Sequence, residues 1–521
     1  MPTASSAATS VTSQPPRPTR VRPVAPAELA AAVAAELRHP AAARPVTGVT
    51  LRAAEVRPGD LFAAVAGARA HGADFAAAAL AAGAAAVLTD PAGAARLRLD
   101  SDAVAVLVHP DPRGVLGELA ARIYGDPTTL LQVIGVTGTS GKTTVAHLIE
   151  AGLSAAGRAS GLLGTVQTRI GEASLPSTFT TPEAPDLQAV FALMAERGVT
   201  DVAMEVSSHA LAFGRVAGTR FAVGAFTNLS QDHLDFHRDM TDYYAAKARL
   251  FDGRAQRHVV CVDDEWGRRL AAATPGVVTV SATGQVADWQ AGDITAAPDG
   301  TQRFVAGAPD GARLPVRLRL PGAFNVANAL VALACLDAVG VPAAMAAERF
   351  ERLTVPGRMQ RIEAGQPFLA VVDYAHKPAA VAALLDALRG QVHSSGGRLL
   401  VVLGCGGDRD RGKRPLMGAI AAGRAELLIV SDDNPRSEDP AEIRRAILEG
   451  ARAEPARGEV LEIGDRRAAI AAAVARARPG DAVVVAGKGH EKGQEIEGVV
   501  HPFDDADELR RAIGAGAGSE R

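Results

Sequence analysis

The sequence predicts an α/β protein of three domains, and three observations support this prediction. The apolar run 130–134 reads as a buried strand that leads into a glycine-rich loop and then a helix. Between residues 355 and 515, apolar strands alternate with helical stretches, and the strands end in polar loops, which is typical of a parallel sheet. The length of 521 residues corresponds to about three domains.

The composition shifts along the chain divide it into a tail and three domains. Residues 1–21 are rich in Ser, Thr, Pro and Ala and lack an apolar signal-peptide core, so they predict a disordered tail. Residues 22–128 predict a small N-terminal α/β domain that begins with an Ala-rich helix over 26–37. Residues 129–354 predict a central domain with a parallel sheet, and residues 355–521 predict a Rossmann-like domain.

Composition argues against several classes of protein. The formal net charge is −3 and aromatic residues are 4% of the chain, so neither a basic nucleic-acid surface nor a base-stacking platform is expected. The sequence has no run of 18 uncharged apolar residues, and we expect no membrane span. The three widely spaced cysteines form no CxxC pair, which favours the reducing cytoplasm over a disulfide framework or a zinc site.

The glycine loop after the first central strand carries the strongest motif. It reads Val133-Ile-Gly-Val-Thr-Gly-Thr-Ser-Gly-Lys-Thr-Thr144 and continues into a helix. This is the P-loop arrangement, in which backbone N–H groups cradle phosphates, Lys142 neutralises them and the hydroxyl of Thr143 meets Mg²⁺. Val136 stands where the general motif has its first glycine. The loop predicts that the chain binds a nucleoside triphosphate.

Polar side chains follow the next central strands. Glu205 ends a predicted strand and is placed to hold Mg²⁺, while Asp232 and His233 follow another strand and could serve a second metal. Lys247 lies within a predicted amphipathic helix over 243–251, and spacing alone predicts a surface residue there.

Two further polar stretches of the central domain have open roles. Asn325 lies near the start of a helix, where it either caps that helix or binds an adenine. The clustered hydroxyls of Ser177-Thr-Phe-Thr-Thr-Pro182 either cap the following helix or bind an anionic substrate.

The C-terminal domain places four polar loops after its strands. Asp373 and His376 follow the first strand, and the loops 404–415, 432–437 and 487–491 follow the others. Ligands of such sheets bind at the carboxyl ends of the strands. One P-loop facing these acids and bases predicts ATP-dependent activation of a substrate carboxylate, followed by attack of a second substrate.

The motifs, taken in order and spacing, resemble the Mur ligases over nearly the whole chain after residue 22. The resemblance rests on Gly138–Thr144, Glu205-Val-Ser-Ser-His209, Asn228 with Asp232-His233, Phe324-Asn325, Gly357-Arg358 and Asp373-Tyr-Ala-His376. Val136 fits this resemblance, because the family's loop does not keep the first glycine. Asp433-Asn-Pro-Arg436 is similar to the signature of the MurE type, which adds meso-diaminopimelate to UDP-N-acetylmuramoyl-L-alanyl-D-glutamate in peptidoglycan synthesis and releases ADP and phosphate through an acyl-phosphate intermediate.

The resemblance also implies roles for individual residues. Catalysis would involve Lys142, Glu205, His233 and Lys247, and Mg²⁺ would be held by Thr143, Glu205, His233 and a carbamylated Lys247. ATP would be bound by Gly138, Thr139, Ser140, Gly141, Lys142, Thr143, Thr144, Asn325, Arg358 and His376. The UDP-MurNAc-dipeptide would be bound by Thr180, Thr181, Ser207 and Arg215. Diaminopimelate would be bound by Arg409, Asp433, Asn434, Pro435, Arg436, Gly487 and Glu491.

The implied amine pocket is chemically coherent. Each end of diaminopimelate carries a carboxylate and an ammonium, so Arg436 can clamp the distal carboxylate while Glu491 pairs with the distal ammonium. Lysine lacks the distal carboxylate and would leave Arg436 unpaired.

Three alternatives remain from the sequence: an L-lysine-adding sister ligase, a folylpolyglutamate synthase-like ligase and a non-catalytic nucleotide-binding regulator. We expect a cytoplasmic monomer that acts on small molecules.

Overall fold

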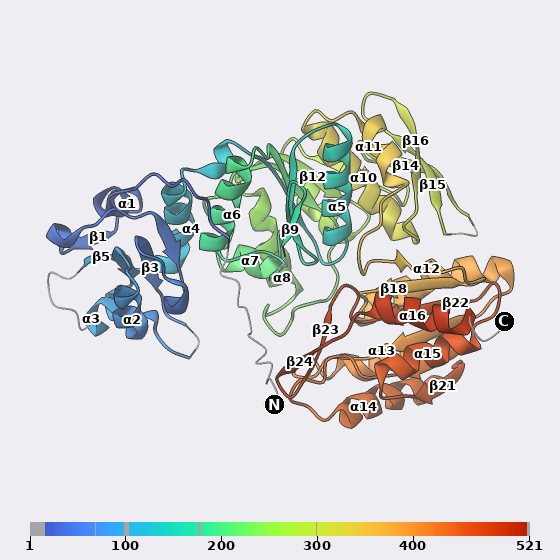
Figure 1. Cartoon of the computed structure of the whole chain (residues 1–521). Coiled ribbons are helices and arrows are strands. Elements are labelled where there is room, and N and C mark those ends of the chain that lie inside the picture. Colours follow the sequence, from blue (N-terminus) through green and yellow to red (C-terminus); the bar gives the residue numbers. More distant parts are fainter. Residues whose placement is uncertain (1–15, 68, 98–103, 176–178, 298–299, 518–521) are drawn as a thin grey trace, which may run out of the picture.

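Three sheets, each formed by a different part of the chain, organise the protein (Figure 1). The computed structural model describes residues 16–67, 69–97, 104–175, 179–297 and 300–517. The sheets follow one another along the chain, with the N-terminal domain at one end, the central domain in the middle and the C-terminal domain below it in Figure 1. The predicted three-domain α/β class is confirmed; the exact domain boundaries stay a prediction.

The N-terminal domain is a small sheet with helices around it. Its strands are β1 Glu36–Arg38, β2 Gly48–Thr50, β3 Asp60–Ala64, β4 Ala86–Thr89 and β5 Ala105–Val108. Its helices are α1 Pro26–Ala32, α2 Ala76–Ala81, α3 Pro91–Arg96 and α4 Pro112–Ile123. The strand order is β1-β5-β4-β3-β2, and only β1 runs antiparallel to its neighbour.

The start of the chain differs from the prediction in two ways. The helix expected over 26–37 ends at Ala32, because Ala34 takes a positive φ of 54° and the chain continues as strand β1. Within the expected tail, residues 1–15 lie outside the described residues. Arg17, however, donates a hydrogen bond of 2.6 Å to Asp60, and Thr19 donates through its backbone N–H to Glu196 at 2.8 Å.

The central domain contains the P-loop and a long mixed sheet. Its strands are β6 Gln132–Thr137, β7 Ser160–Leu163, β8 Thr168–Ile170, β9 Ala173–Leu175, β10 Asp201–Glu205, β11 Phe221–Phe226, β12 Ala255–Cys261, β13 Val278–Ser281, β14 Trp289–Ala296, β15 Gln302–Gly307 and β16 Arg313–Leu318. Its helices are α5 Lys142–Ala155, α6 Ala184–Glu196, α7 Ser208–Ala212, α8 Met240–Ala248, α9 Glu265–Ala273, α10 Ala323–Ala338 and α11 Ala343–Phe350. The strand order is β16-β15-β14-β13-β12-β11-β6-β10-β7-β8-β9, with a parallel middle and antiparallel edges.

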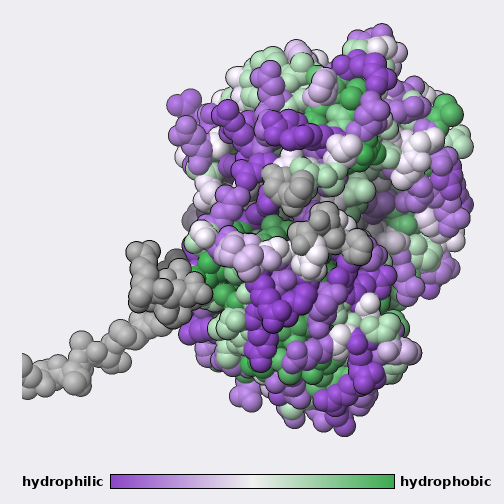
Figure 2. All heavy atoms as spheres, turned by 90° about the vertical axis from the view of Figure 1, so that its right-hand side faces the viewer, coloured by the Kyte–Doolittle hydropathy of each residue, from purple (hydrophilic) through white to green (hydrophobic). Residues whose placement is uncertain are grey.

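The C-terminal domain is a Rossmann-like sheet with a separate hairpin. Its strands are β17 Gln360–Arg361, β18 Leu369–Asp373, β19 Leu399–Leu403, β20 Leu427–Val430, β21 Glu459–Glu462, β22 Ala482–Ala486, β23 Gly493–Ile496 and β24 Val499–Pro502. Its helices are α12 Pro378–Ser395, α13 Lys413–Ala422, α14 Pro440–Ala453, α15 Arg466–Arg476 and α16 Asp505–Ala517. The main order is β17-β18-β22-β19-β20-β21, and β23 pairs with β24. Figure 2 faces the right-hand side of Figure 1 and shows hydrophilic and hydrophobic residues intermixed on that surface.

The parallel register determines where the functional loops lie. In the central sheet, Glu205 of β10 pairs with Val136 of β6, so the loop after β10 begins beside the P-loop. In the C-terminal sheet, Ala486 of β22 pairs with both Asp373 and Leu403. The loops after β18, β19 and β22 therefore share one edge, and this edge carries the predicted polar residues.

A buried ion pair stabilises the C-terminal domain beneath this edge. Arg466 at the start of α15 and Asp505 at the start of α16 are both fully buried and make two hydrogen bonds of 2.7 Å. Arg466 also donates to the carbonyl of Ala486 at 3.0 Å, so the pair supports the last residue of β22. Removing one member would leave an uncompensated buried charge.

We expect Arg466→Ala to lower the free energy of unfolding of the C-terminal domain by about 3–5 kcal/mol. Both tryptophans, Trp266 and Trp289, lie in the central domain, so fluorescence would not report this loss. Hydrogen-exchange mass spectrometry of the β19 and β22 peptides would measure it. Arg510→Ala, which breaks an exposed pair with Asp507, is the matched control and should change little. Equal hydrogen-exchange protection in the two variants would contradict a stabilising role of the Arg466–Asp505 pair.

Candidate active site

The P-loop connects β6 to α5 and leaves little room for side chains. Gly138 and Gly141 have positive φ angles of 146° and 88°. A Cβ atom on Gly141 would lie 2.3 Å from the side-chain oxygen of Asn328. The backbone N–H of Ser140 donates to Asn228 at 2.9 Å, so the loop is held from the neighbouring strand end. Thr143 and Thr144 are buried in the first turn of α5.

Two lysines converge on one carbonyl of this loop. Lys142 Nζ donates to the carbonyl oxygens of Gly138 at 2.9 Å and Thr139 at 3.0 Å, and Lys247 Nζ donates to that of Gly138 at 2.8 Å. Lys247 is 1% exposed, so the surface position predicted from helical spacing is wrong. Burial lowers the pKa of Lys142 to about 8 and holds the pKa of Lys247 well below its usual value.

Oxygen atoms cluster next to these lysines. The hydroxyl of Thr143 donates to Glu205 Oε2 at 3.0 Å, and the backbone N–H of Thr165 donates to Glu205 Oε1 at 2.7 Å. Glu205 is 1% exposed at the end of β10. A carboxylate and a hydroxyl that share a buried position form a donor set suited to a hard cation such as Mg²⁺.

Asp232 lies between His233 and a lysine of the C-terminal domain. His233 Nε2 is 3.0 Å from Asp232, and Lys377 of the C-terminal domain also pairs with Asp232. Burial alone would raise the pKa of Asp232, but Lys377 and His233 outweigh it and lower that pKa. Burial lowers the pKa of His233 to about 4, so the imidazole is neutral at pH 7 and can act as a ligand or acceptor.

The C-terminal domain contributes Arg358 and His376 to the nucleotide side. Arg358 Nη2 donates to the hydroxyl of Thr143 at 3.2 Å, and its guanidinium lies 4.4 Å from the ring centre of Tyr374. His376 donates through Nδ1 to the carbonyl of Tyr374 at 2.7 Å, and burial lowers its pKa to about 3.

Asn325 is buried inside α10, where its amide donates to the carbonyl of Pro321 at 2.6 Å and accepts from Asn328 at 3.0 Å. Gly322, not Asn325, occupies the cap position of α10. The capping alternative for Asn325 is therefore wrong.

The residues predicted for the UDP-linked substrate gather around Glu205. The hydroxyl of Thr181 donates to the carbonyl of Glu205 at 2.8 Å, and Arg215 donates to the carbonyl of Thr181 at 3.2 Å. Thr180 meets Thr165 at 2.9 Å, and Ser207 caps α7 by accepting from the N–H of Ala210 at 3.1 Å. Ser177 and Thr178 lie outside the described residues.

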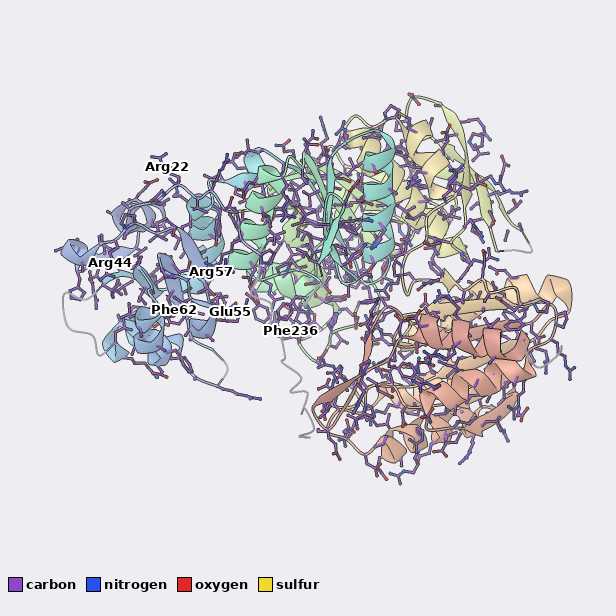
Figure 3. All side chains as sticks on the ribbon, in the orientation of Figure 1. Arg22, Arg44, Glu55, Arg57, Phe62 and Phe236 are labelled. Atoms are coloured by element: carbon purple, nitrogen blue, oxygen red, sulfur yellow. The ribbon has the colours of Figure 1, made fainter. Side chains whose placement is uncertain are left out.

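Sequence reasoning did not foresee an exposed aromatic patch next to this group. The rings of His209 and Phe236 stack with centres 4.2 Å apart, and Phe213 lies 5.1 Å from Phe236. Figure 3 places Phe236 at the margin of the central domain that lies toward the C-terminal domain. The guanidinium of Arg215 lies 5.2 Å from the ring centre of Phe179 and 5.9 Å from that of Phe213. These apolar rings flank the cation.

The predicted amine pocket is assembled from three strand-end loops. Asn434 donates to Glu491 Oε2 at 2.7 Å, which joins the loop after β20 to the loop after β22. Arg436 donates to Glu495 at 3.1 Å and to the carbonyl of Gly407 at 2.7 Å, which adds the loop after β19. Arg409 lies exposed in that last loop.

Close backbone packing fixes the remaining predicted pocket residues. Gly487 has a φ of 118°, and a Cβ atom there would lie 2.5 Å from Asp433 Oδ2. The carbonyl of Pro435 similarly lies 1.9 Å from the position that a Cβ atom on Gly407 would take. Only glycine fits at these two positions. Contacts of the described residues thus join Asp433, Asn434, Arg436, Gly487 and Glu491 or the loops that carry them, whereas none of these contacts involves Arg409.

Comparisons with known proteins agree with this arrangement. Family models match the Mur ligase family catalytic domain over residues 45–124, the Mur ligase middle domain over 136–336 and the Mur ligase glutamate ligase domain over 357–489. The chain is 55% identical over 461 residues to the UDP-N-acetylmuramoyl-L-alanyl-D-glutamate--2,6-diaminopimelate ligase of Corynebacterium glutamicum, covering 87% of this chain and 89% of that one. The chain belongs to the Mur ligase family. The resemblance identified from the motifs is thus confirmed.

Other Mur ligases match over similar lengths. The enzyme of the same name from Streptomyces coelicolor is 53% identical over 506 residues, which cover 96% of this chain and 98% of the relative. A solved structure of a UDP-N-acetylmuramoyl-L-alanyl-D-glutamate--2,6-diaminopimelate ligase superposes with a TM-score of 0.65 at 36% identity and covers 91% of this chain and 96% of its own.

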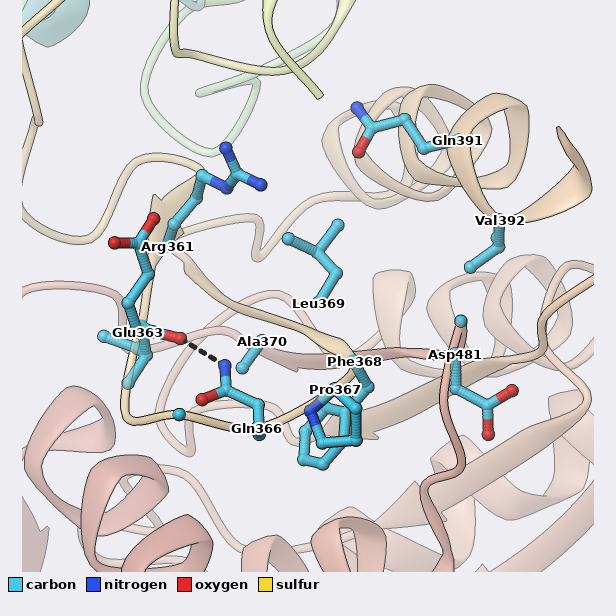
Figure 4. Close-up of a pocket in the computed structure, with 13 residues that line it drawn as sticks. Arg361, Glu363, Gln366, Pro367, Phe368, Leu369, Ala370, Gln391, Val392 and Asp481 are labelled. Carbon is cyan, nitrogen blue, oxygen red and sulfur yellow. Dashed lines mark hydrogen bonds between the residues drawn. The ribbon is translucent and has the colours of Figure 1, made fainter. Parts of the chain in front are cut away.

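The cavity shown in Figure 4 lies away from the loops that carry the predicted site residues. It has a volume of about 530 Å³ and is lined by Arg361–Glu363, Gly365–Ala370, Gln391, Val392, Gly480 and Asp481. Leu369 and Asp481 stand at the amino ends of β18 and β22, opposite the edge that carries Asp373 and Gly487. None of the predicted site residues lines it.

Within the described residues, no helix has both the length and the apolar character needed to cross a membrane.

The packing around Gly141 predicts a loss of nucleotide binding when the residue is enlarged. Gly141→Ala must displace Asn328 and strain a backbone with positive φ, so we expect the Kd for ATP to rise by about tenfold or more. Isothermal titration calorimetry measures this change. Gly157→Ala is the control, because Gly157 also has a positive φ, of 72°, but has open space around its Cβ position. Similar Kd values for the two variants would show that the close packing of Gly141 against Asn328 does not matter for ATP binding.

Proposed function

We propose that the chain is an ATP-dependent ligase that joins meso-diaminopimelate to UDP-N-acetylmuramoyl-L-alanyl-D-glutamate through an acyl phosphate, releasing ADP and phosphate in peptidoglycan synthesis. Relatives at 43–55% identity over most of the chain carry the name of this ligase, which confirms the expectation from the motifs. The observation that carries the proposal is the joining of the loops at Asn434 and Glu491 beside the Arg436 guanidinium.

The nucleotide site is proposed at the junction of the central and C-terminal domains. Gly138–Thr144 would cradle the phosphates, and Arg358, His376 and Asn325 would complete the site. Thr143 and Glu205 fit Mg²⁺ through their adjacent oxygens, and His233 and a carbamylated Lys247 would add to that shell. Mg²⁺ supplies neutralisation of the charge that develops on the transferred phosphoryl group.

The residues of this chain position the other two substrates. Thr180, Thr181, Ser207 and Arg215 surround Glu205 and would hold the UDP-linked donor with its carboxylate toward the phosphates. Once the ammonium of Lys142 leaves the loop carbonyls, it would lie between the donor carboxylate and the γ-phosphate and reduce their repulsion. Arg409, Asp433–Arg436, Gly487 and Glu491 would hold the amine substrate. The chemistry then depends on orientation rather than on a covalent protein nucleophile.

We also propose a division of labour, a compartment and an assembly state. Residues 22–128 would bind the UDP part, residues 129–354 ATP, and residues 355–521 the amino acid. A cytoplasmic monomer is consistent with Cys261, Cys335 and Cys405, which are all buried and free.

The alternatives from the sequence find less support. Neither an L-lysine-adding ligase nor a folylpolyglutamate synthase needs a fork such as Arg436 for a distal carboxylate. A non-catalytic regulator has no need of the buried charged residues Glu205 and Lys247, whose desolvation is costly.

Phosphate release tests the proposal directly. The assay contains UDP-MurNAc-L-Ala-D-Glu and ATP·Mg²⁺ with either meso-diaminopimelate or L-lysine as the amine. Release that requires diaminopimelate supports the proposal. Release with lysine alone would overturn the amine assignment, and release with neither would overturn the ligase assignment.

Arg436→Ala should raise the KM for diaminopimelate by about a hundredfold, because a charge-assisted fork contributes about 1.5–3 kcal/mol. The Kd for ATP should stay unchanged, since the partners of Arg436, Glu495 and the carbonyl of Gly407, are residues of the C-terminal domain outside the proposed nucleotide site. Steady-state kinetics and calorimetry measure the two quantities. Arg445→Ala, which removes an exposed arginine paired with Glu442, is the control. An unchanged KM for diaminopimelate in Arg436→Ala would exclude the clamp.

Lys247→Ala should abolish ligation and regain part of it when short carboxylic acids are added. Burial lowers the pKa of Lys247, which favours the neutral amine that reacts with carbon dioxide. A small carboxylate could then occupy the position of the carbamate. Phosphate release at increasing acetate concentration measures the rescue. Lys247→Ala activity that is independent of added acid would count against a carbamate.

A further inference from the structure

A fully buried lysine sits behind the amine pocket and has no role in the proposed reaction so far. Lys488 follows β22, and its side chain is 0% exposed. A buried ammonium is costly unless polar partners surround it. Neither the motif comparison nor helical or strand spacing pointed to this residue, although it stands between the two glycines of a strand-end loop.

The partners of Lys488 are all residues of the amine pocket. Its Nζ donates to Asn434 Oδ1 at 2.7 Å and lies 3.7 Å from Asp433 Oδ1 and 3.6 Å from Glu491 Oε2. The backbone N–H of Glu495 donates to the same Asn434 oxygen at 3.0 Å. Two donors on Oδ1 fix the orientation of the amide, so its NH₂ group must point to Glu491, where it lies 2.7 Å from Oε2.

The positive charge of Lys488 also affects the net charge of the amine pocket. Asp433 and Glu491 both approach Nζ, and Lys488 compensates one of their two negative charges. Arg466 and Lys413 also interact with these carboxylates, but without Lys488 Asp433 and Glu491 lose the cation that lies within 4 Å of both, and the pocket becomes more negative by one charge. Such a pocket repels an incoming carboxylate and attracts a lone ammonium. The distal end of diaminopimelate carries a carboxylate as well as an ammonium, so its binding depends on the positive charge of Lys488. The side chain of lysine carries only an ammonium and does not depend on that charge.

We propose that Lys488 is a positioning and specificity-determining residue of the amine pocket. It holds Asn434 and Glu491 in the geometry that receives an ammonium, and it offsets the negative charge that would otherwise repel the distal carboxylate beside Arg436. The inference rests on the proposed function, because it concerns the amine that this ligase accepts.

The test compares Lys488→Met with Lys492→Met, a substitution of the same kind at an exposed lysine four residues further on. KM and kcat are measured for meso-diaminopimelate and L-lysine, together with the Kd for ATP. In Lys488→Met the KM for diaminopimelate should rise about tenfold or more, and the preference for diaminopimelate over lysine should narrow by a similar factor. The Kd for ATP should stay as in wild type, and Lys492→Met should behave as wild type throughout.

Two results would overturn the inference. One is a diaminopimelate KM within twofold of wild type in Lys488→Met. The other is a rise of similar size in the KM for diaminopimelate, the KM for lysine and the Kd for ATP, with an unchanged preference between the two amines. That result would indicate that Lys488 has only a structural role. If Lys488→Met does not fold, Lys488→Gln takes its place, since this shorter side chain still has an N–H donor in the direction of Asn434 but carries no charge. In that variant the preference should still narrow, and an unchanged preference would overturn the inference.

The failure of this inference is distinguishable from the failure of the proposed function. Wild-type enzyme that releases phosphate only with diaminopimelate supports the function whatever Lys488→Met shows. Wild-type enzyme that does not use diaminopimelate overturns the function itself.

Discussion

Each functional loop follows the carboxyl end of a parallel strand, and the rest of the site depends on this constraint. The in-register pairing of β10 with β6 places Glu205 next to the P-loop, and the pairing of β22 with β18 and β19 gathers the amine-pocket loops. Two interactions then join these edges across the domains: Arg358 donates to Thr143, and Lys377 pairs with Asp232. The proposed phosphate and amine sites are therefore built from loops of two domains.

Three lysines of the site are enclosed by polar partners, and they are held in two different ways. Lys142 and Lys247 both donate to the carbonyl of Gly138, and among the described residues no carboxylate is hydrogen-bonded to either of them. Burial lowers the pKa of both. Lys488 instead lies between an amide oxygen and two carboxylates. The first arrangement leaves Lys142 free to exchange a neutral carbonyl for an anion and leaves Lys247 with a lowered pKa that suits carbamylation, whereas the second keeps the Lys488 cation fixed in place.

The sequence was informative where chemistry is local and less so where it depends on distant contacts. The P-loop, the strand-end Glu205 and the Asp433–Arg436 loop could be predicted because a few consecutive residues define them. Lys247 was wrongly predicted to lie on the surface, because helical spacing does not show what packs against a helix. Its side chain is buried against the P-loop, where it donates to the carbonyl of Gly138, 109 residues away. The first helix was predicted too long because alanine propensity cannot reveal the positive φ at Ala34.

Lys377 and Lys488 could not have been selected from spacing for a related reason. A lysine after a strand is usually a solvated surface residue, and only the tertiary partner shows otherwise. Asp232 lies 145 residues before Lys377, and Asn434 lies 54 residues before Lys488. Motif residues such as Arg436 are the ones proposed to contact the ligand, whereas Lys377 and Lys488 contact other side chains of the site. Selectivity for a zwitterionic end therefore depends on the charge behind the clamp as well as on the clamp itself, since a carboxylate can reach Arg436 only if Asp433 and Glu491 do not repel it first.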